Sequence, residues 1–303
     1  MSSAYLHLGI VYLVWGSTYL AIRVAVREGS GFPPFSMGAS RVILAGLLLL
    51  GWAALSRKRV RPTRRELLVL AGSGLLLWSA GNGLVIWAEQ RADSALAALM
   101  IGTTPIWAVL IEAALDRRRP SPLLLAGLLS GLVGIGLLSA PVLAGGVRAD
   151  VLSVVALVLA AAAWALGSVL LNRHPVDLPL RVSSGYQHLA GGIGFLALML
   201  LTREPLPSPQ PQALAAWGYL VVFGSIIAFT SYVSILRTLP VSIATSSSFV
   251  NPIIAVILGA ALLQEPITPW TVSGAALVLL AVAGAFRDRQ LQSRRVPSQG
   301  EAG

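Results

Sequence analysis

Long apolar stretches alternate with short polar segments along almost the whole chain. A helix needs about 20 apolar residues to cross the hydrocarbon core of a bilayer, and the polar breaks fall at this spacing. The breaks carry proline, glycine and charged residues, which are typical of turns. The pattern predicts ten membrane-spanning helices, at residues 6–26, 35–56, 66–88, 94–115, 122–140, 151–171, 181–201, 213–236, 241–262 and 270–286.

The composition agrees with an integral membrane protein. Hydrophobic residues make up 56% of the 303 residues, charged residues make up only 11%, and the mean hydropathy is +0.79. A soluble domain carries about 25% charged residues, so this chain has too much apolar surface to keep from water by folding alone. The first apolar stretch lacks a basic leading segment and a clear cleavage site, so we interpret it as a retained span and not as a signal peptide.

The net charge of +10 is distributed as in a membrane protein and does not indicate nucleic-acid binding, because the charges flank apolar spans. With the N-terminus inside, the outer loops hold Arg27, Arg91, Arg148 and Arg203. This asymmetry predicts a multi-pass protein of a bacterial-type inner (plasma) membrane, with both termini and a polar tail at residues 287–303 in the cytoplasm. The inner segments would hold Arg57, Lys58, Arg59, Arg61, Arg64, Arg65, Arg117, Arg118, Arg119, Arg173, Arg181, Arg237, Arg287, Arg289, Arg294 and Arg295.

The two halves of the chain repeat the same features. Gly16-Ser17, directly after Trp15, is echoed by Gly167-Ser168, and later features recur 147 residues on, such as Pro105 and Pro252. Each unit has five spans, an odd number, so the second unit enters the membrane in the opposite orientation, as in many transporters. The sequence therefore predicts an all-α membrane protein of two inverted five-helix repeats, residues 1–143 and 144–286, around a central cavity.

Two predicted spans, the fourth and the ninth, carry polar residues and a proline in their middle. Proline lacks a backbone N–H and kinks or opens a helix. In lipid such a break survives only against other helices or a wet cavity. Polar, broken helices at matching places in two halves are typical of a transporter's substrate site, so we predict helix breaks at Pro105 and Pro252.

Aromatic and polar residues share helix faces near these breaks. Residues four apart lie on one face of a helix, as do Trp15 and Tyr19, Trp78 and Asn82, and Trp164 and Ser168. Small polar residues could instead serve close helix packing, and the aromatic residues could face lipid or the core. The predicted substrate-binding residues are Trp15, Tyr19, Trp78, Asn82, Met100, Thr104, Trp164, Ser168, Ser225, Tyr232, Ser247 and Asn251.

Charged residues inside apolar spans are costly and usually functional. Arg41 and His188 occupy equivalent places in the two halves, so we predict that they mark the two gates, with Glu89 as the partner of Arg41. A hydrogen bond between helices is the alternative role. The chain has no cysteine, three dispersed histidines and no carboxylate at mid-depth, so neither a catalytic group nor a metal ligand nor a cofactor is predicted, and an enzyme is disfavoured.

These residues resemble the drug/metabolite transporter superfamily in its ten-span EamA form. The matching pieces are Trp15-Gly16-Ser17, Arg41, the Ala-rich helix ending in Pro105, and residues 249–268 followed by Gly274. The resemblance covers nearly the whole chain and is closest to YddG-like amino acid exporters. The chain departs from the family at Arg118, where a Glu is expected opposite Glu265.

The resemblance implies a carrier of a small-molecule substrate in the lipid bilayer. We expect export of amino acids, including those with apolar and aromatic side chains, by a facilitator that works by alternating access. The alternative is a proton-coupled exporter of drugs or other small metabolites, with His188 as the proton relay. Small-residue faces at Gly191-Gly192 and at residues 127–136 could pack helices within one subunit or between two.

Overall fold

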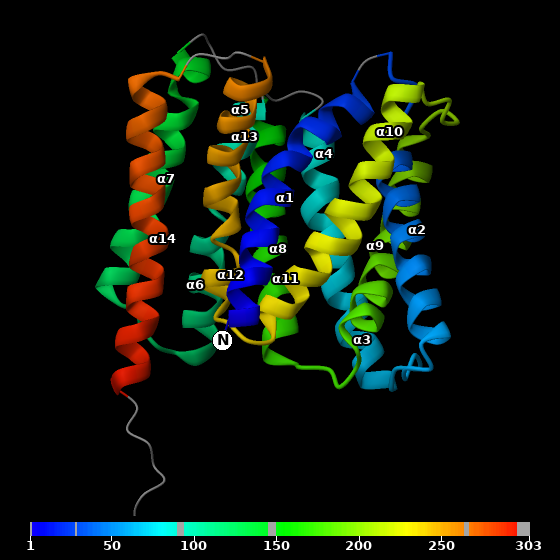
Figure 1. The fold of residues 1–303 in the computed structure, drawn as a ribbon, viewed down its shortest axis with the longest axis horizontal. Coiled ribbons are helices and arrows are strands. Elements are labelled where there is room, and N and C mark those ends of the chain that lie inside the picture. Colours follow the sequence, from blue (N-terminus) through cyan, green and yellow to red (C-terminus); the bar gives the residue numbers. More distant parts are fainter. Residues whose placement is uncertain (1, 28, 90–93, 145–149, 264–266, 296–303) are drawn as a thin grey trace, which may run out of the picture.

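The computed structural model describes residues 2–27, 29–89, 94–144, 150–263 and 267–295, and within these ranges all regular structure is helical (Figure 1). The α-helices are α1 (Ser2–Val26), α2 (Pro34–Leu55), α3 (Arg64–Gly74), α4 (Gly83–Glu89), α5 (Ser94–Ile101), α6 (Thr104–Asp116), α7 (Pro122–Ala144), α8 (Val151–Arg173), α9 (Leu180–Thr202), α10 (Pro211–Tyr219), α11 (Phe229–Leu236), α12 (Val241–Ala244), α13 (Ser247–Leu263) and α14 (Pro269–Arg295). Two further segments are π-helices, η1 (Leu75–Asn82) and η2 (Leu220–Ala228).

Eight helical stretches are long and apolar enough to cross a membrane, and each coincides with one of the predicted spans. The ninth predicted span is divided into α12 and α13, and its described part includes a shorter apolar helical stretch at Val241–Ile254. The seventh predicted span corresponds to α9, which is not among the eight stretches. Gln187 and His188 lower its hydropathy, although both side chains are fully buried. The membrane character is therefore established, while the count of ten remains a prediction.

Helix α1 begins and α14 ends at the same end of the bundle (Figure 1). The loops at residues 56–63, 117–121 and 174–179 lie at this end too, and we call it the basic end because Arg57, Lys58, Arg59 and Arg117 to Arg119 occupy these loops. The loops at residues 29–33 and 203–210 lie at the opposite end, which we call the far end. The helices thus run across the bundle from one end to the other, as membrane spans do.

The third and eighth predicted spans each contain a π-helical segment. Segment η1 continues α3 into α4, and η2 continues α10 into α11. The two segments lie almost 147 residues apart, which is the repeat offset predicted from the sequence. A π turn adds a residue to the helix, re-aims the side chains around it and is frequent at functional sites. Trp78, Asn82 and Ser225 all lie on these segments.

The fourth predicted span is interrupted at Gly102-Thr103, and Pro105 is the second residue of the helix that resumes there, α6. The prediction for Pro252 is wrong, because Pro252 lies inside α13 and the ninth span is interrupted earlier, at Thr245-Ser246. The reason lies in the hydroxyl groups. Thr245 donates to the carbonyl of Val241 at 2.8 Å and Ser246 to that of Ile243 at 2.6 Å, so carbonyls at the interruption are satisfied locally.

Helices of the two predicted repeats pair with each other. The second and seventh spans, α2 and α9, pack together, and so do the fifth and tenth, α7 and α14. Both contacts depend on glycine. A Cβ on Gly134 would lie 2.8 Å from the carbonyl of Gly274, and one on Gly192 would lie 2.4 Å from Ile43. Both predicted small-residue faces therefore contribute to packing within one chain.

Candidate functional site

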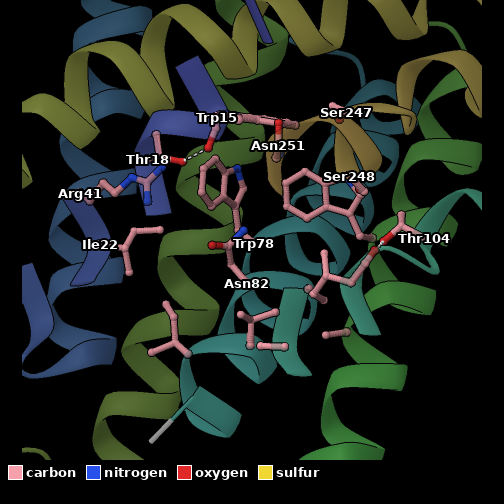
Figure 2. A pocket seen from close by; sticks show the side chains of 17 residues that line it. Trp15, Thr18, Ile22, Arg41, Trp78, Asn82, Thr104, Ser247, Ser248 and Asn251 are labelled. Atoms are coloured by element: carbon pink, nitrogen blue, oxygen red, sulfur yellow. Dashed lines mark hydrogen bonds between the residues drawn. The ribbon is translucent and has the colours of Figure 1, made fainter. Parts of the chain in front are cut away.

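A cavity of about 120 Å³ lies between the two halves and is lined by residues of both (Figure 2). A buried water needs about 10–15 Å³ by the same measure, so the cavity has room for several waters or part of a small solute. Eight predicted residues line it: Trp15, Arg41, Trp78, Asn82, Thr104, Trp164, Ser247 and Asn251. These eight residues come from six separate helical segments and share one space.

Three tryptophans form an aromatic wall of this cavity. The ring centroids of Trp15 and Trp164 lie 5.5 Å apart in an edge-to-face arrangement, and those of Trp78 and Trp164 lie 6.4 Å apart in a similar one. Such pairs are favourable beyond the area that they bury. The wall offers ring faces and edges to a solute while its own contacts hold the rings in place.

Tyr232 and Ser168, also predicted to bind substrate, lie directly behind the wall. The indole N–H of Trp164 donates to the Tyr232 hydroxyl at 3.1 Å, and the Ser168 and Tyr232 hydroxyls share a hydrogen bond of 2.7 Å. Both side chains are fully buried, and neither lines the cavity. These two residues therefore hold Trp164 in place from behind and do not themselves face the cavity.

Arg41 is 5% exposed and faces the cavity (Figure 2). Its Nε donates to the Ser225 hydroxyl at 2.8 Å, and its guanidinium carbon lies 5.3 Å from the centroid of the Trp78 ring. At this distance the cation interacts favourably with the π face. Ser225, a predicted binding residue, thus contacts Arg41 and does not itself line the cavity.

His188 is placed behind the aromatic wall and not in the cavity. Its ring lies 4.9 Å from that of Trp78 and 4.6 Å from that of Phe229, and its Nδ1 lies 2.7 Å from the Ser184 carbonyl oxygen. His188 is fully buried, and it supports Trp78 from the side away from the cavity. Arg41 also contacts the Trp78 ring, so the two predicted gate residues lie close to the same aromatic ring.

The interrupted helices bring hydroxyl and amide groups to the cavity. Thr104 donates to the carbonyl of Ile101 at 2.6 Å and Ser247 to that of Ala244 at 3.3 Å, so these hydroxyls serve the interruptions. By contrast, the amide oxygen of Asn251 and the indole N–H of Trp78 are buried and have no hydrogen-bond partner among the described residues. Unsatisfied buried polar atoms are costly, so each of these atoms is suited to take a further hydrogen-bond partner.

Like Ser168, Ser225, Tyr232 and His188, the predicted residue Met100 is not part of the cavity lining. Met100 is half-buried and packs beside Ala97 and Leu157 instead. The reason is the helix interruption that follows it, which turns Met100 and Thr104 to different surroundings. The side chains of Tyr19 and Glu89 lie outside the described residues, so their predicted roles stay predictions.

Sequence reasoning missed about half of the cavity lining. Thr18 lies three residues after Trp15, so helix periodicity and polarity were signals for it. The others are small or aliphatic and carry no chemical signal by themselves. The missed residues are Thr18, Ile22, Gly81, Val85, Ile86, Ala97, Ile101 and Ala160.

The cavity is closed toward the basic end and extends toward the far end. On the closed side the Tyr12 and Ser246 hydroxyls share a hydrogen bond of 2.7 Å, and the rings of Trp15 and Tyr232 lie 5.0 Å apart. On the other side the lining continues through Ile22, Val85 and Ala97, close to where α1 and α4 end and α5 begins. Access from one end at a time is what a carrier requires.

An apolar helical bundle with a central, partly polar cavity between two similar halves defines a membrane transporter. A family description of EamA-like transporters matches residues 2–140 and 151–287, so the chain belongs to the EamA-like transporter family, within the drug/metabolite transporter superfamily, and carries two EamA domains. Members of this family are transporters and not enzymes.

Relatives of known name agree with this family. The uncharacterized inner membrane transporter YedA of Escherichia coli K12 is 33% identical over 283 residues, which cover 91% of this chain and 89% of YedA. The protein PecM of Dickeya dadantii is 26% identical over 291 residues, which cover 93% and 91% of the two chains. A solved crystal structure shares the fold with a TM-score of 0.80 at 24% identity, over 96% of this chain and 99% of the other.

Proposed function

We propose that this chain exports amino acids, with a broad range that includes apolar and aromatic side chains, across the inner membrane by alternating access. The observation that carries the proposal is the cavity between the halves. Three tryptophans supply an apolar wall, while Arg41 and Asn251 supply polar groups that an amino acid's charged end would need. A cavity of this kind selects for a polar head group and tolerates variation in the apolar part.

The proposed architecture is a pair of inverted repeats, residues 1–143 and 144–286. It is supported by helix contacts that occur in equivalent pairs. Span one contacts span nine (α1 with α13), and the equivalent spans six and four also contact each other (α8 with α6). In the same way span three contacts span seven (α3 with α9), and the equivalent spans eight and two contact each other (η2 with α2). A two-fold axis in the membrane plane produces such reciprocal pairs. The two halves would then rock about the cavity between them.

We propose a facilitator and not a proton-coupled carrier. Arg41 is the single charged residue among the cavity lining in the described structure, and the lining there includes no Asp, Glu or His. An ordinary proton carrier needs a group in the pathway that gains and loses a proton near neutral pH. One observation favours the alternative: the Nε2 atom of His188 is buried and has no partner among the described residues. Proton-coupled export of drugs or other small metabolites is therefore the second candidate.

Counterflow into proteoliposomes tests both candidates. Vesicles loaded with unlabelled L-phenylalanine or L-leucine should accumulate the radiolabelled amino acid without a pH gradient, because exchange through a facilitator needs only the substrate gradient. The control is Trp270→Ala, since Trp270 is 55% exposed on the bundle surface and away from the cavity. Uptake that occurs only when a pH gradient is imposed would support the second candidate, and no uptake of any amino acid would exclude the first.

A further inference from the structure

Arg41 holds a buried cation at the edge of the cavity with most of its donors unused. A guanidinium group has five N–H donors in a fixed fork. The described hydrogen bonds use only the Nε donor, which is bound to Ser225 at 2.8 Å. The remaining four N–H groups are on Nη1 and Nη2. Two parallel donors of this kind match the two oxygens of a carboxylate.

No carboxylate of the described structure neutralises Arg41. The ion pairs there join Arg59 to Glu66 and Arg173 to Asp116, and these residues lie at the basic end, away from the cavity. A charge buried in a membrane protein is costly unless it is paired. Contact with the Trp78 ring compensates only part of this cost, because a cation–π interaction is much weaker than an ion pair with two hydrogen bonds.

The π segment η2 fixes Arg41 in this orientation. Ser225 accepts the Nε hydrogen bond, and a Cβ on the adjacent Gly224 would lie 3.0 Å from Nη2 of Arg41. The Gly224 carbonyl also accepts a hydrogen bond of 3.2 Å from the indole N–H of Trp15. The same turn of η2 therefore contacts both the Arg41 guanidinium group and the Trp15 ring, and it fixes their relative positions.

An ammonium group finds fewer partners in the cavity. Carbonyls at both helix interruptions already accept hydrogen bonds from neighbouring hydroxyls, including those of Thr104, Thr245 and Ser246. The described lining contains no acidic side chain, and amide oxygens such as that of Asn251 are the acceptors that remain. The cavity is therefore built around recognition of an anion and not of a cation.

We propose that Arg41 binds the carboxylate of the transported solute, that Ser225 and Gly224 position Arg41, and that the solute's ammonium group is dispensable. The substrate class is an organic monocarboxylate with an apolar or aromatic body that lies against Trp15, Trp78 and Trp164. This inference rests on the proposed transport function and deepens it by naming the substrate class, of which an amino acid is one member.

The test is a series of competitors that share one aromatic body, used on the wild-type protein in the phenylalanine counterflow assay. L-phenylalanine and 3-phenylpropanoate carry the carboxylate, whereas phenethylamine and L-phenylalaninamide lack it. The two carboxylates should compete at similar concentrations, and the two cations should be weaker by about tenfold or more, the difference expected for a charge-assisted pair. Cations that compete as well as the carboxylates would overturn this inference and leave amino acid export standing.

Variants then identify the residue. Arg41→Gln should abolish the difference between the carboxylates and the cations, Arg41→Lys should restore part of it, and Ser225→Ala should reduce it without removing binding. Binding is read from tryptophan fluorescence in detergent, and the melting temperature of each variant shows whether it folds. A folded Arg41→Gln protein that still prefers carboxylates would overturn the role of Arg41. Failure of every aromatic competitor would overturn both this inference and the proposed function.

Discussion

At the scale of single residues, the aromatic wall is the part of the site that the sequence identified best. Trp15, Trp78 and Trp164 lie too deep in their spans for the interfacial belt, and all three line the cavity. The residues behind the wall were also predicted to bind substrate, and the sequence did not distinguish them from the wall itself. Whether a side chain faces the solute or supports another side chain depends on helix rotation, and for Ser168, Tyr232 and Ser225 the sequence does not specify that rotation.

Trp164 gives a direct test of the wall. Trp164→Ala removes ring contacts to Trp15 and Trp78 and the indole N–H that donates to Tyr232. Because one aromatic pair is worth about 0.5–1.5 kcal/mol beyond its buried area, we expect phenylalanine to bind about tenfold more weakly, measured by competition in counterflow. Trp164→Phe should keep most of the affinity. The matched control is Trp270→Ala, and equal binding by Trp164→Ala and the wild type would contradict the wall's role.

Gly191 tests how tightly Trp78 is held. A Cβ at Gly191 would lie 2.4 Å from the Cβ of Trp78, so Gly191→Ala must push α9 and η1 apart or move the ring. Overpacking of this kind costs about 1–3 kcal/mol, and we expect a lower unfolding temperature in detergent together with weaker substrate binding.

Gly51 is the control for Gly191. It lies in α2 with no other atom within 4 Å of its added Cβ, and a helical Gly→Ala change in open space is neutral or stabilising by up to about 1 kcal/mol. Gly51→Ala should therefore leave the unfolding temperature equal to or above that of the wild type. Similar losses in both variants would show that the Trp78 contact is not the cause.

At the scale of the elements, the apolar periodicity predicted most helices, but it did not predict their irregularities. The π segments η1 and η2 have ordinary apolar sequences, and the tertiary contacts around them, such as that between Gly74 and the Gln187 carbonyl, are not visible in the chain order. Pro252 shows the converse. Proline was the obvious candidate for a break, yet the interruption lies at Thr245-Ser246, where hydroxyl groups satisfy the carbonyls.

The contact between α1 and the second interruption is a candidate latch for the closed end. Tyr12 and Ser246 share a hydrogen bond of 2.7 Å there. Tyr12→Phe removes it, and the loss of about 1 kcal/mol would shift the equilibrium between the two conformations by about fivefold toward opening at the basic end. A single cysteine at Val85, on the accessible side of the cavity, should then react more slowly with a thiol reagent added from the far end.

The control for the latch is Tyr5→Phe. Tyr5 is 42% exposed, and its ring packs 5.9 Å from that of Phe286, away from the second interruption. This variant should label at Val85→Cys at the rate of the parent. An unchanged rate in Tyr12→Phe would mean that the Tyr12–Ser246 bond does not hold the end closed.

At the scale of the whole molecule, the doubled sequence pattern was more informative than any single motif. The offset of 147 residues predicted which helices are equivalent, and the equivalent helices α2 and α9, and α7 and α14, are packed together. The cavity could not be derived in the same way. Its aliphatic lining, such as Ile22 and Val85, has the same character as residues that face lipid, so only the assembled bundle distinguishes the two surroundings.

The distribution of charge predicts the orientation of the whole molecule in the membrane. The basic end carries a clear excess of Arg and Lys, and such segments remain on the cytoplasmic side.

The chain has no cysteine, so a single introduced cysteine reports its own location. Arg61→Cys lies in an exposed loop of the basic end and Leu206→Cys in an exposed loop of the far end, where Leu206 is 92% exposed. In intact spheroplasts a membrane-impermeant maleimide should label Leu206→Cys and leave Arg61→Cys unlabelled until the membrane is permeabilised. The reverse pattern would place the termini outside, and the accessible side of the cavity would then face the cytoplasm.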